Sequence, residues 1–250
     1  MNLSLLDSLL WAAGFLGNAA LLFVLVYKRR YRTVPWFTTW ITFGIVYTIT
    51  LFAAFRVGTK HVYAVLYWSG AFLDLLLQLS VVLEIATYVF RRGDRWVEGA
   101  KGRFALMGLC APLIAGVLAW QMKPAATSAL DAWESRDSLF TTVVVCILFS
   151  AVMVVSQQVG VGWRDLVLRE GYGLIAVALV AFITDTLHAY WRTIEHFSQL
   201  ENLRMVAYLG TLVYWSVIFW LPERGMTSLD PDANKYLEAL RRALEYPKIK

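Results

Sequence analysis

Seven apolar stretches, each long enough to cross a bilayer, account for most of this 250-residue chain. About 20 residues of α-helix span the hydrocarbon core of a membrane. We place the seven helices at about 5–27, 35–55, 61–90, 104–122, 138–163, 168–191 and 203–221. With 59% hydrophobic and 16% charged residues, a single water-soluble core would not hide so much apolar surface. The sequence therefore predicts an all-α integral membrane protein, a seven-transmembrane-helix bundle over residues 1–222, in the cell (inner or plasma) membrane.

The distribution of Lys and Arg predicts how the bundle is oriented. The loops after the first, third and fifth spans carry more Lys and Arg than the other three loops. Because basic loops stay in the cytoplasm, we expect the N-terminus outside and the C-terminus inside. Residues 223–250 are then a cytoplasmic tail with a short amphipathic helix at about 231–246, begun by Asp230 and Pro231. This helix is predicted either to lie on the inner membrane surface or to dock a cytoplasmic partner.

Composition and motifs argue against several classes of function. The net charge of +5 does not indicate nucleic-acid binding, because the basic residues cluster in short loops between the spans. The two cysteines, Cys110 and Cys146, both lie within spans, without disulfide or zinc spacing. The sequence has no H-E-x-x-H, G-x-S-x-G or glycine-rich phosphate loop, and only one of its three histidines lies deep in a span. We therefore predict neither an enzyme nor a bound cofactor or metal.

Polar residues inside the spans are the candidate functional residues, because ionisable groups at bilayer depth are costly. Asp74 lies near the middle of the third span, and Gln78 follows one helical turn later on the same face. Asp185 in the sixth span shares its face with His188, as an ion pair or a shared-proton pair. We expect no Lys or Arg deep enough to neutralise these carboxylates, so each is hydrated, hydrogen-bonded or protonated.

The candidate residues divide into two sets according to their expected depth in the membrane. The predicted ligand- or proton-binding set lies in the middle and outer half, where aromatic side chains line a cavity for a small apolar or cationic ligand. This set comprises Asp74, Gln78, Asp185, His188, Tyr67 and Trp215. The inner polar set comprises Glu84, Gln157 and Gln158. The alternative for both sets is interhelical hydrogen bonding and aromatic packing without a ligand.

Gly17 and Asn18, followed by the basic stretch from Lys28 to Arg32, resemble the first helix and first inner loop of class A G-protein-coupled receptors. That resemblance covers about 30 residues and departs elsewhere, since the D/E-R-Y, C-W-x-P and N-P-x-x-Y motifs are missing. The seven-helix count is similar to that of microbial rhodopsins, but the seventh span has no lysine to hold retinal. The chain also resembles bacterial seven-helix proteins of sensor or receptor-like type, including the membrane modules that precede some histidine kinases.

Three hypotheses about function remain open at this point. The first is a receptor-like or sensory protein that binds a small or lipidic ligand within the bundle and signals to a cytoplasmic partner. The second is a proton-coupled transporter or channel, suggested by Asp185, Asp74 and Glu84 at successive depths. The third is a structural subunit of a larger membrane complex, suggested by the wide aromatic surfaces. In each case the lipid bilayer is the first partner.

Overall fold

The fold consists of seven long helices, and the computed structural model describes residues 5–92, 95–96, 100–121, 129–159, 165–191 and 194–221. The helices are α1 (Leu5–Tyr27), α2 (Pro35–Val57), α3 (Lys60–Phe90), α4 (Ala100–Gln121), α5 (Ala129–Val159), α6 (Leu166–Trp191) and α7 (Ile194–Trp220). A 3-10 turn (Arg30–Arg32) precedes α2, and two short antiparallel strands, β1 (Arg91–Arg92) and β2 (Arg95–Trp96), follow α3. All seven helices contain a segment long and apolar enough to cross a membrane, which confirms the predicted seven spans.

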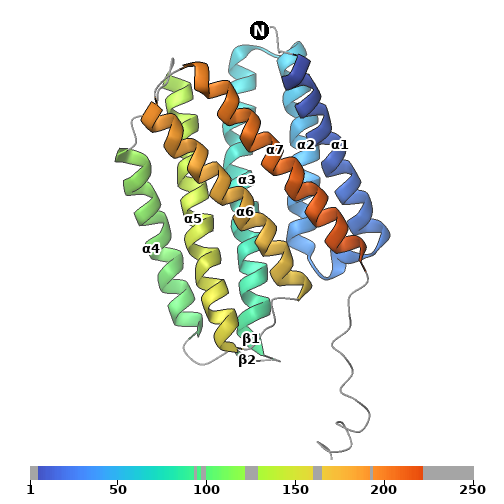
Figure 1. Ribbon diagram of the computed structural model, residues 1–250, viewed down its shortest axis with the longest axis vertical. Coiled ribbons are helices and arrows are strands. Elements are labelled where there is room, and N and C mark those ends of the chain that lie inside the picture. The colour runs from blue at the N-terminus through green and yellow to red at the C-terminus, as the bar shows by residue number, and fades with distance from the viewer. Residues whose placement is uncertain are drawn as a thin grey trace, which may run out of the picture. The chain divides into compact units, whose positions relative to one another are not determined.

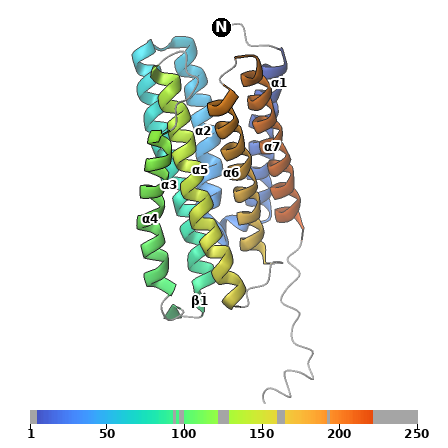
Figure 2. The same cartoon turned by 60° about the vertical axis from the view of Figure 1, so that its left-hand side comes forward.

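Six of the helices form a ring, and α4 lies outside it. Each of α1, α2, α3, α5, α6 and α7 packs on the next in that order, and α7 closes the ring against α1. The fourth helix packs on α5 at the edge of the bundle (Figures 1 and 2). On α4 the residues that turn inward are Ala111, Ala115 and Ala119, one every four residues. Such small side chains let two membrane helices approach closely.

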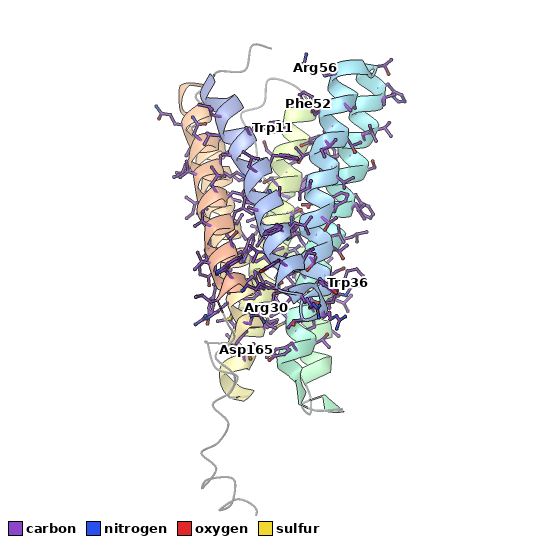
Figure 3. All side chains as sticks on the ribbon, turned by 90° about the vertical axis from the view of Figure 1, so that its right-hand side faces the viewer. Trp11, Arg30, Trp36, Phe52, Arg56 and Asp165 are labelled. Carbon is purple, nitrogen blue, oxygen red and sulfur yellow. The ribbon has the colours of Figure 1, made fainter. Side chains whose placement is uncertain are left out.

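The two ends of the bundle are distinguished by the residues labelled in Figure 3. At one end lie Arg30, Trp36 and Asp165, near the connections that follow α1 and α5. We call this the basic end, since Lys28, Arg29, Arg30 and Arg32 follow α1 there. Trp11, Phe52 and Arg56 lie at the other end, which we call the opposite end (Figure 3).

The outer surface of the bundle is apolar, as a lipid-facing surface must be. Leu16 of α1, Phe72 of α3 and Leu113 of α4 are each more than 60% exposed. The closely packed core is made largely of Val, Leu, Ala and Phe side chains and includes the fully buried Trp215. Exposed apolar side chains of this size would be unfavourable in water but need no cover in a bilayer.

Helix α1 is fixed against α7 by the Gly17 and Asn18 pair noted in the sequence. A Cβ atom on Gly17 would lie 2.9 Å from a methyl carbon of Leu212, so glycine is what allows this approach. The Asn18 amide nitrogen donates to the Gly14 carbonyl oxygen at 2.9 Å, and its oxygen accepts a hydrogen bond from the Tyr208 hydroxyl at 3.0 Å. The pair therefore has a packing role in this chain.

Two helices begin nine residues earlier than the sequence interpretation placed them, and α4 begins four residues earlier, at Ala100. Helix α5 begins at Ala129 rather than near residue 138, and α7 begins at Ile194 rather than near residue 203. The additional turns contain charged residues, which end an apolar span without ending a helix. The amphipathic helix expected at about 231–246 lies outside the described residues.

Candidate functional site

Glu84 of α3 holds the first turn of α2 at the basic end. Helix α2 begins with Pro35 after Val34, and its first turn has no capping side chain of its own. The two carboxylate oxygens of Glu84 accept the backbone N–H groups of Trp36 at 3.3 Å and Phe37 at 3.2 Å. A carboxylate is favoured there because helix N-termini carry unpaired N–H groups and partial positive charge. Glu84, expected in the inner polar set, is thus an interhelical cap.

Asp74 and Gln78 share one face of α3, as their spacing predicts, and they are hydrogen-bonded to each other. The Gln78 side-chain nitrogen donates to Asp74 Oδ2 at 2.6 Å. The indole nitrogen of Trp40 in α2 donates to Asp74 Oδ1 at 2.8 Å. The Asp74 carboxyl is therefore satisfied by one donor from its own helix and one from the neighbouring helix.

Trp215 of α7 lies beside Trp40 and fills the interior near the basic end. Its side chain is fully buried, and its ring centroid lies 6.0 Å from that of Trp40 and 4.9 Å from that of Phe37. The indole nitrogen donates to the backbone carbonyl oxygen of Glu170 at 3.0 Å. Gly173 makes room for this ring, since a Cβ there would lie 2.3 Å from the indole nitrogen.

Tyr67 and Trp215 do not share a cavity, which corrects the expectation that both lie in the outer half. Tyr67 lies near the start of α3, at the opposite end, where it stacks with Tyr63 and contacts Trp68 edge-on. Its backbone carbonyl oxygen accepts the Tyr47 hydroxyl at 2.9 Å. Trp215 lies five residues from the end of α7 and bonds to the first turns of α6, at the basic end.

Asp185 lies in a separate site formed by α5, α6 and α7. Its Oδ2 atom accepts the Ser138 hydroxyl at 2.8 Å, and its Oδ1 atom lies 3.7 Å from Arg204 Nη1. The expectation that no Arg lies deep enough to neutralise a carboxylate was therefore wrong. Because α7 begins at Ile194, Arg204 lies within the helix and reaches the buried Asp185.

Three further predicted residues are placed only along their helices. His188 lies in α6, and Gln157 and Gln158 lie near the end of α5, but their side chains lie outside the part of the structure that is described. The predicted pairing of Asp185 with His188 and the role of the two glutamines therefore stay predictions. Among the described residues, no group of three or more His, Cys, Asp and Glu side chains is placed to bind a metal ion.

Glu170 is a buried carboxylate that the sequence interpretation missed. It lies in the second turn of α6 and has 0% exposure. Among the residues that the structure describes, neither of its carboxylate oxygens has a hydrogen-bond partner. A sequence signal does exist, because Gly171 and Gly173 follow it directly. Glycines in a membrane helix indicate close approach of neighbouring helices, here on two sides of α6, and hence burial of the residue beside them.

No family model, curated protein or solved structure matches this chain. The class of protein therefore follows from the fold. Seven long apolar helices with an apolar outer surface make this a multi-pass membrane protein.

Proposed function

We propose that this protein is a receptor-like or sensory protein of the cell membrane, with its N-terminus outside and its C-terminus inside. It binds a small or lipidic ligand within the bundle and signals to a cytoplasmic partner. The observation that carries the proposal is a connected set of side chains from the middle of α3 to the basic end. Asp74 binds Trp40, Trp40 packs against Trp215, and Trp215 binds the Glu170 backbone.

This connection gives a stimulus at Asp74 a physical route to three other helices. If a ligand takes the place of Trp40 at the Asp74 carboxylate, the indole loses its acceptor and its position against Trp215. Trp215 is fully buried and tightly packed, so it responds by discrete repacking rather than by a gradual shift. Such repacking changes how α2, α6 and α7 meet at the basic end, where a cytoplasmic partner would bind.

The test is a distance measurement between two spin labels at the basic end of the full chain in nanodiscs. One label replaces the exposed Thr33 before α2, and the other replaces the exposed Val217 of α7. We expect Asp74→Asn to change the distribution of distances between the labels. Asp185→Asn, which alters the separate site at the opposite end, is the matched control and leaves the distribution unchanged. A lipid extract should shift the distribution of the wild type but not that of Asp74→Asn. Identical distributions in all samples would refute the proposal.

A second candidate function is proton-coupled transport, which is favoured by the spread of carboxylates along the bundle. Asp185 lies towards the opposite end, Asp74 near the middle of α3, and Glu84 ten residues further on at the basic end. Proteoliposomes that contain a pH-sensitive dye distinguish the two functions. A transporter loses proton flux in Asp74→Asn, whereas a flux equal to that of the wild type removes Asp74 from the pathway.

A further inference from the structure

Glu170 stands apart from every other buried acidic side chain that the structure describes. Asp185, the other fully enclosed carboxylate, accepts a hydroxyl and lies near an arginine. Asp74 has two donors and Glu84 has two backbone N–H groups. Both oxygens of Glu170 are buried without a hydrogen bond, and no ion pair reaches them from the described residues.

The backbone of α6 around Glu170 is closely packed against apolar side chains. A Cβ atom on the adjacent Gly171 would lie 2.0 Å from the ring of Phe149 and 3.2 Å from Ile85, so α6 contacts both α5 and α3 here. On the next turn Trp215 of α7 is bound to the Glu170 carbonyl oxygen. The segment of α6 that carries the fully buried Glu170 thus contacts three helices, in the half of the bundle near the basic end.

The charged and titratable groups described on these helices do not neutralise the negative charge that an ionised Glu170 would carry. On α3 the nearest is Glu84, whose carboxylate is close enough to interact with Glu170 and carries the same sign of charge. On α7 the Tyr214 hydroxyl donates to the Arg169 carbonyl oxygen, and the cation Arg204 lies near Asp185. The described charges of α5, Arg136 and Asp137, lie near its start, at the opposite end.

An ionised carboxylate in this position is strongly unfavourable, because it is fully buried without donors or a counter-charge among the described residues. A neutral carboxylic acid is far less unfavourable there, because only its unmade hydrogen bonds oppose burial. We propose that Glu170 is a proton-binding site, which carries its proton in the packed bundle and exchanges it with water at the basic end. On release the O–H bond breaks, its electron pair stays on the carboxylate oxygen, and the proton passes to water.

Because Glu84 interacts with Glu170, this proton exchange affects the contact between α3 and α2. Release of the proton creates a second negative charge that repels the Glu84 carboxylate, and Glu84 is the group that caps the first turn of α2. Repulsion between them weakens the link between α3 and α2, and with it the position of the α1–α2 connection. Glu84 is only partly buried and binds the N–H of the exposed Trp36, which gives the site a route to water. This chemistry is independent of whether the bundle signals or transports.

Infrared difference spectroscopy of the full chain in nanodiscs, across a pH series in H2O and D2O, tests the proposal. We expect a carbonyl stretching band of a protonated carboxylic acid that moves to lower frequency in D2O. The band should be lost in Glu170→Gln and kept in Asp74→Asn and Glu84→Gln, which remove the neighbouring carboxyl groups one at a time. A wild type without the band, as when a bound metal cation neutralises an ionised Glu170, overturns the proposal. A band that persists in Glu170→Gln also overturns it.

A second variant separates protonation from folding. Glu170→Met places an apolar side chain of similar length in the same site. If the native carboxyl is neutral, this variant folds at least as well as the wild type and lacks the band. If the native carboxyl is ionised and held by a partner, removing the carboxylate strands that partner, and the thermal stability of Glu170→Met falls well below that of the wild type. That result contradicts the proposal.

Discussion

The contact between Gly173 and Trp215 gives the most direct test of how the interior is packed. In Gly173→Ala the new Cβ would lie 2.3 Å from Nε1 and 2.6 Å from Cε2 of Trp215. Carbon atoms in contact normally lie about 3.5–4.0 Å apart, so the indole must move by about 1 Å. Trp215 is fully buried, and Phe37, only 4.9 Å away between ring centroids, lies against it.

The expected loss of stability combines three effects. Overpacking a filled core costs about 1–3 kcal/mol. Displacing the indole from the Glu170 carbonyl leaves a buried N–H unpaired, at a further cost of about 1–3 kcal/mol. Alanine in place of glycine returns roughly 1 kcal/mol through its higher helix propensity. We therefore expect Gly173→Ala to lower the free energy of unfolding by about 1–5 kcal/mol.

The assay follows the labelling of the half-buried Cys146 by a maleimide across a denaturant series, in a Cys110→Ser background. Gly44→Ala in α2 is the matched control, because nothing lies within 4 Å of a Cβ built there. It should be neutral or stabilising by up to about 1 kcal/mol. In a Trp215→Ala background the penalty of Gly173→Ala should disappear, since the obstructing ring is gone. A penalty that equals the control, or that persists without the ring, would refute the reasoning.

Two further predictions concern the carboxylates. Glu84→Ala removes both acceptors from the first turn of α2, so we expect a loss of about 1–2 kcal/mol in the same assay, with faster hydrogen exchange at Trp36 and Phe37. Unchanged exchange at these two amides would contradict the capping role. Asp185→Asn and Arg204→Met, combined in a double-mutant cycle, should give a coupling energy of about 0.2–1 kcal/mol, because Arg204 is 37% exposed. A coupling energy of zero would mean that the 3.7 Å pair contributes nothing to stability.

The number of helices could be predicted from the sequence because it depends on the length and apolarity of each segment, which are local properties. The starts of α5 and α7 could not be predicted in this way. Hydropathy detects only the apolar part of a helix, and both helices begin with polar turns. Ser135 and Arg136 continue α5, and Glu201 and Arg204 continue α7. Missing the extension of α7 had a chemical consequence, since it left Arg204 at the edge of the predicted span and Asp185 without an expected cation.

Within the candidate site, contacts between residues close in the sequence could be predicted, whereas contacts between distant residues could not. The Asp74 and Gln78 pair follows from helical spacing alone. The donation from Trp40 to Asp74 joins residues 34 positions apart and depends on how α2 and α3 are rotated about their axes. The placement of Trp215 depends on its depth in α7 and on the glycine of α6 that admits it. Rotation and depth are set by packing across the ring, which a single sequence does not specify.

Glu170 shows how local features can mislead even when each is interpreted correctly. A carboxylate near the start of a membrane helix is ordinarily favoured by the helix dipole and by the nearby aqueous interface, so it invites no functional interpretation. The glycines that follow reverse this expectation, because close helix packing removes the water that would solvate the charge. The informative pattern is therefore the combination of an acidic residue with adjacent glycines, Glu170-Gly171-Tyr172-Gly173. The same packing that admits the Trp215 ring encloses the carboxyl, so the position of the proton and the position of α7 are linked through one segment of α6.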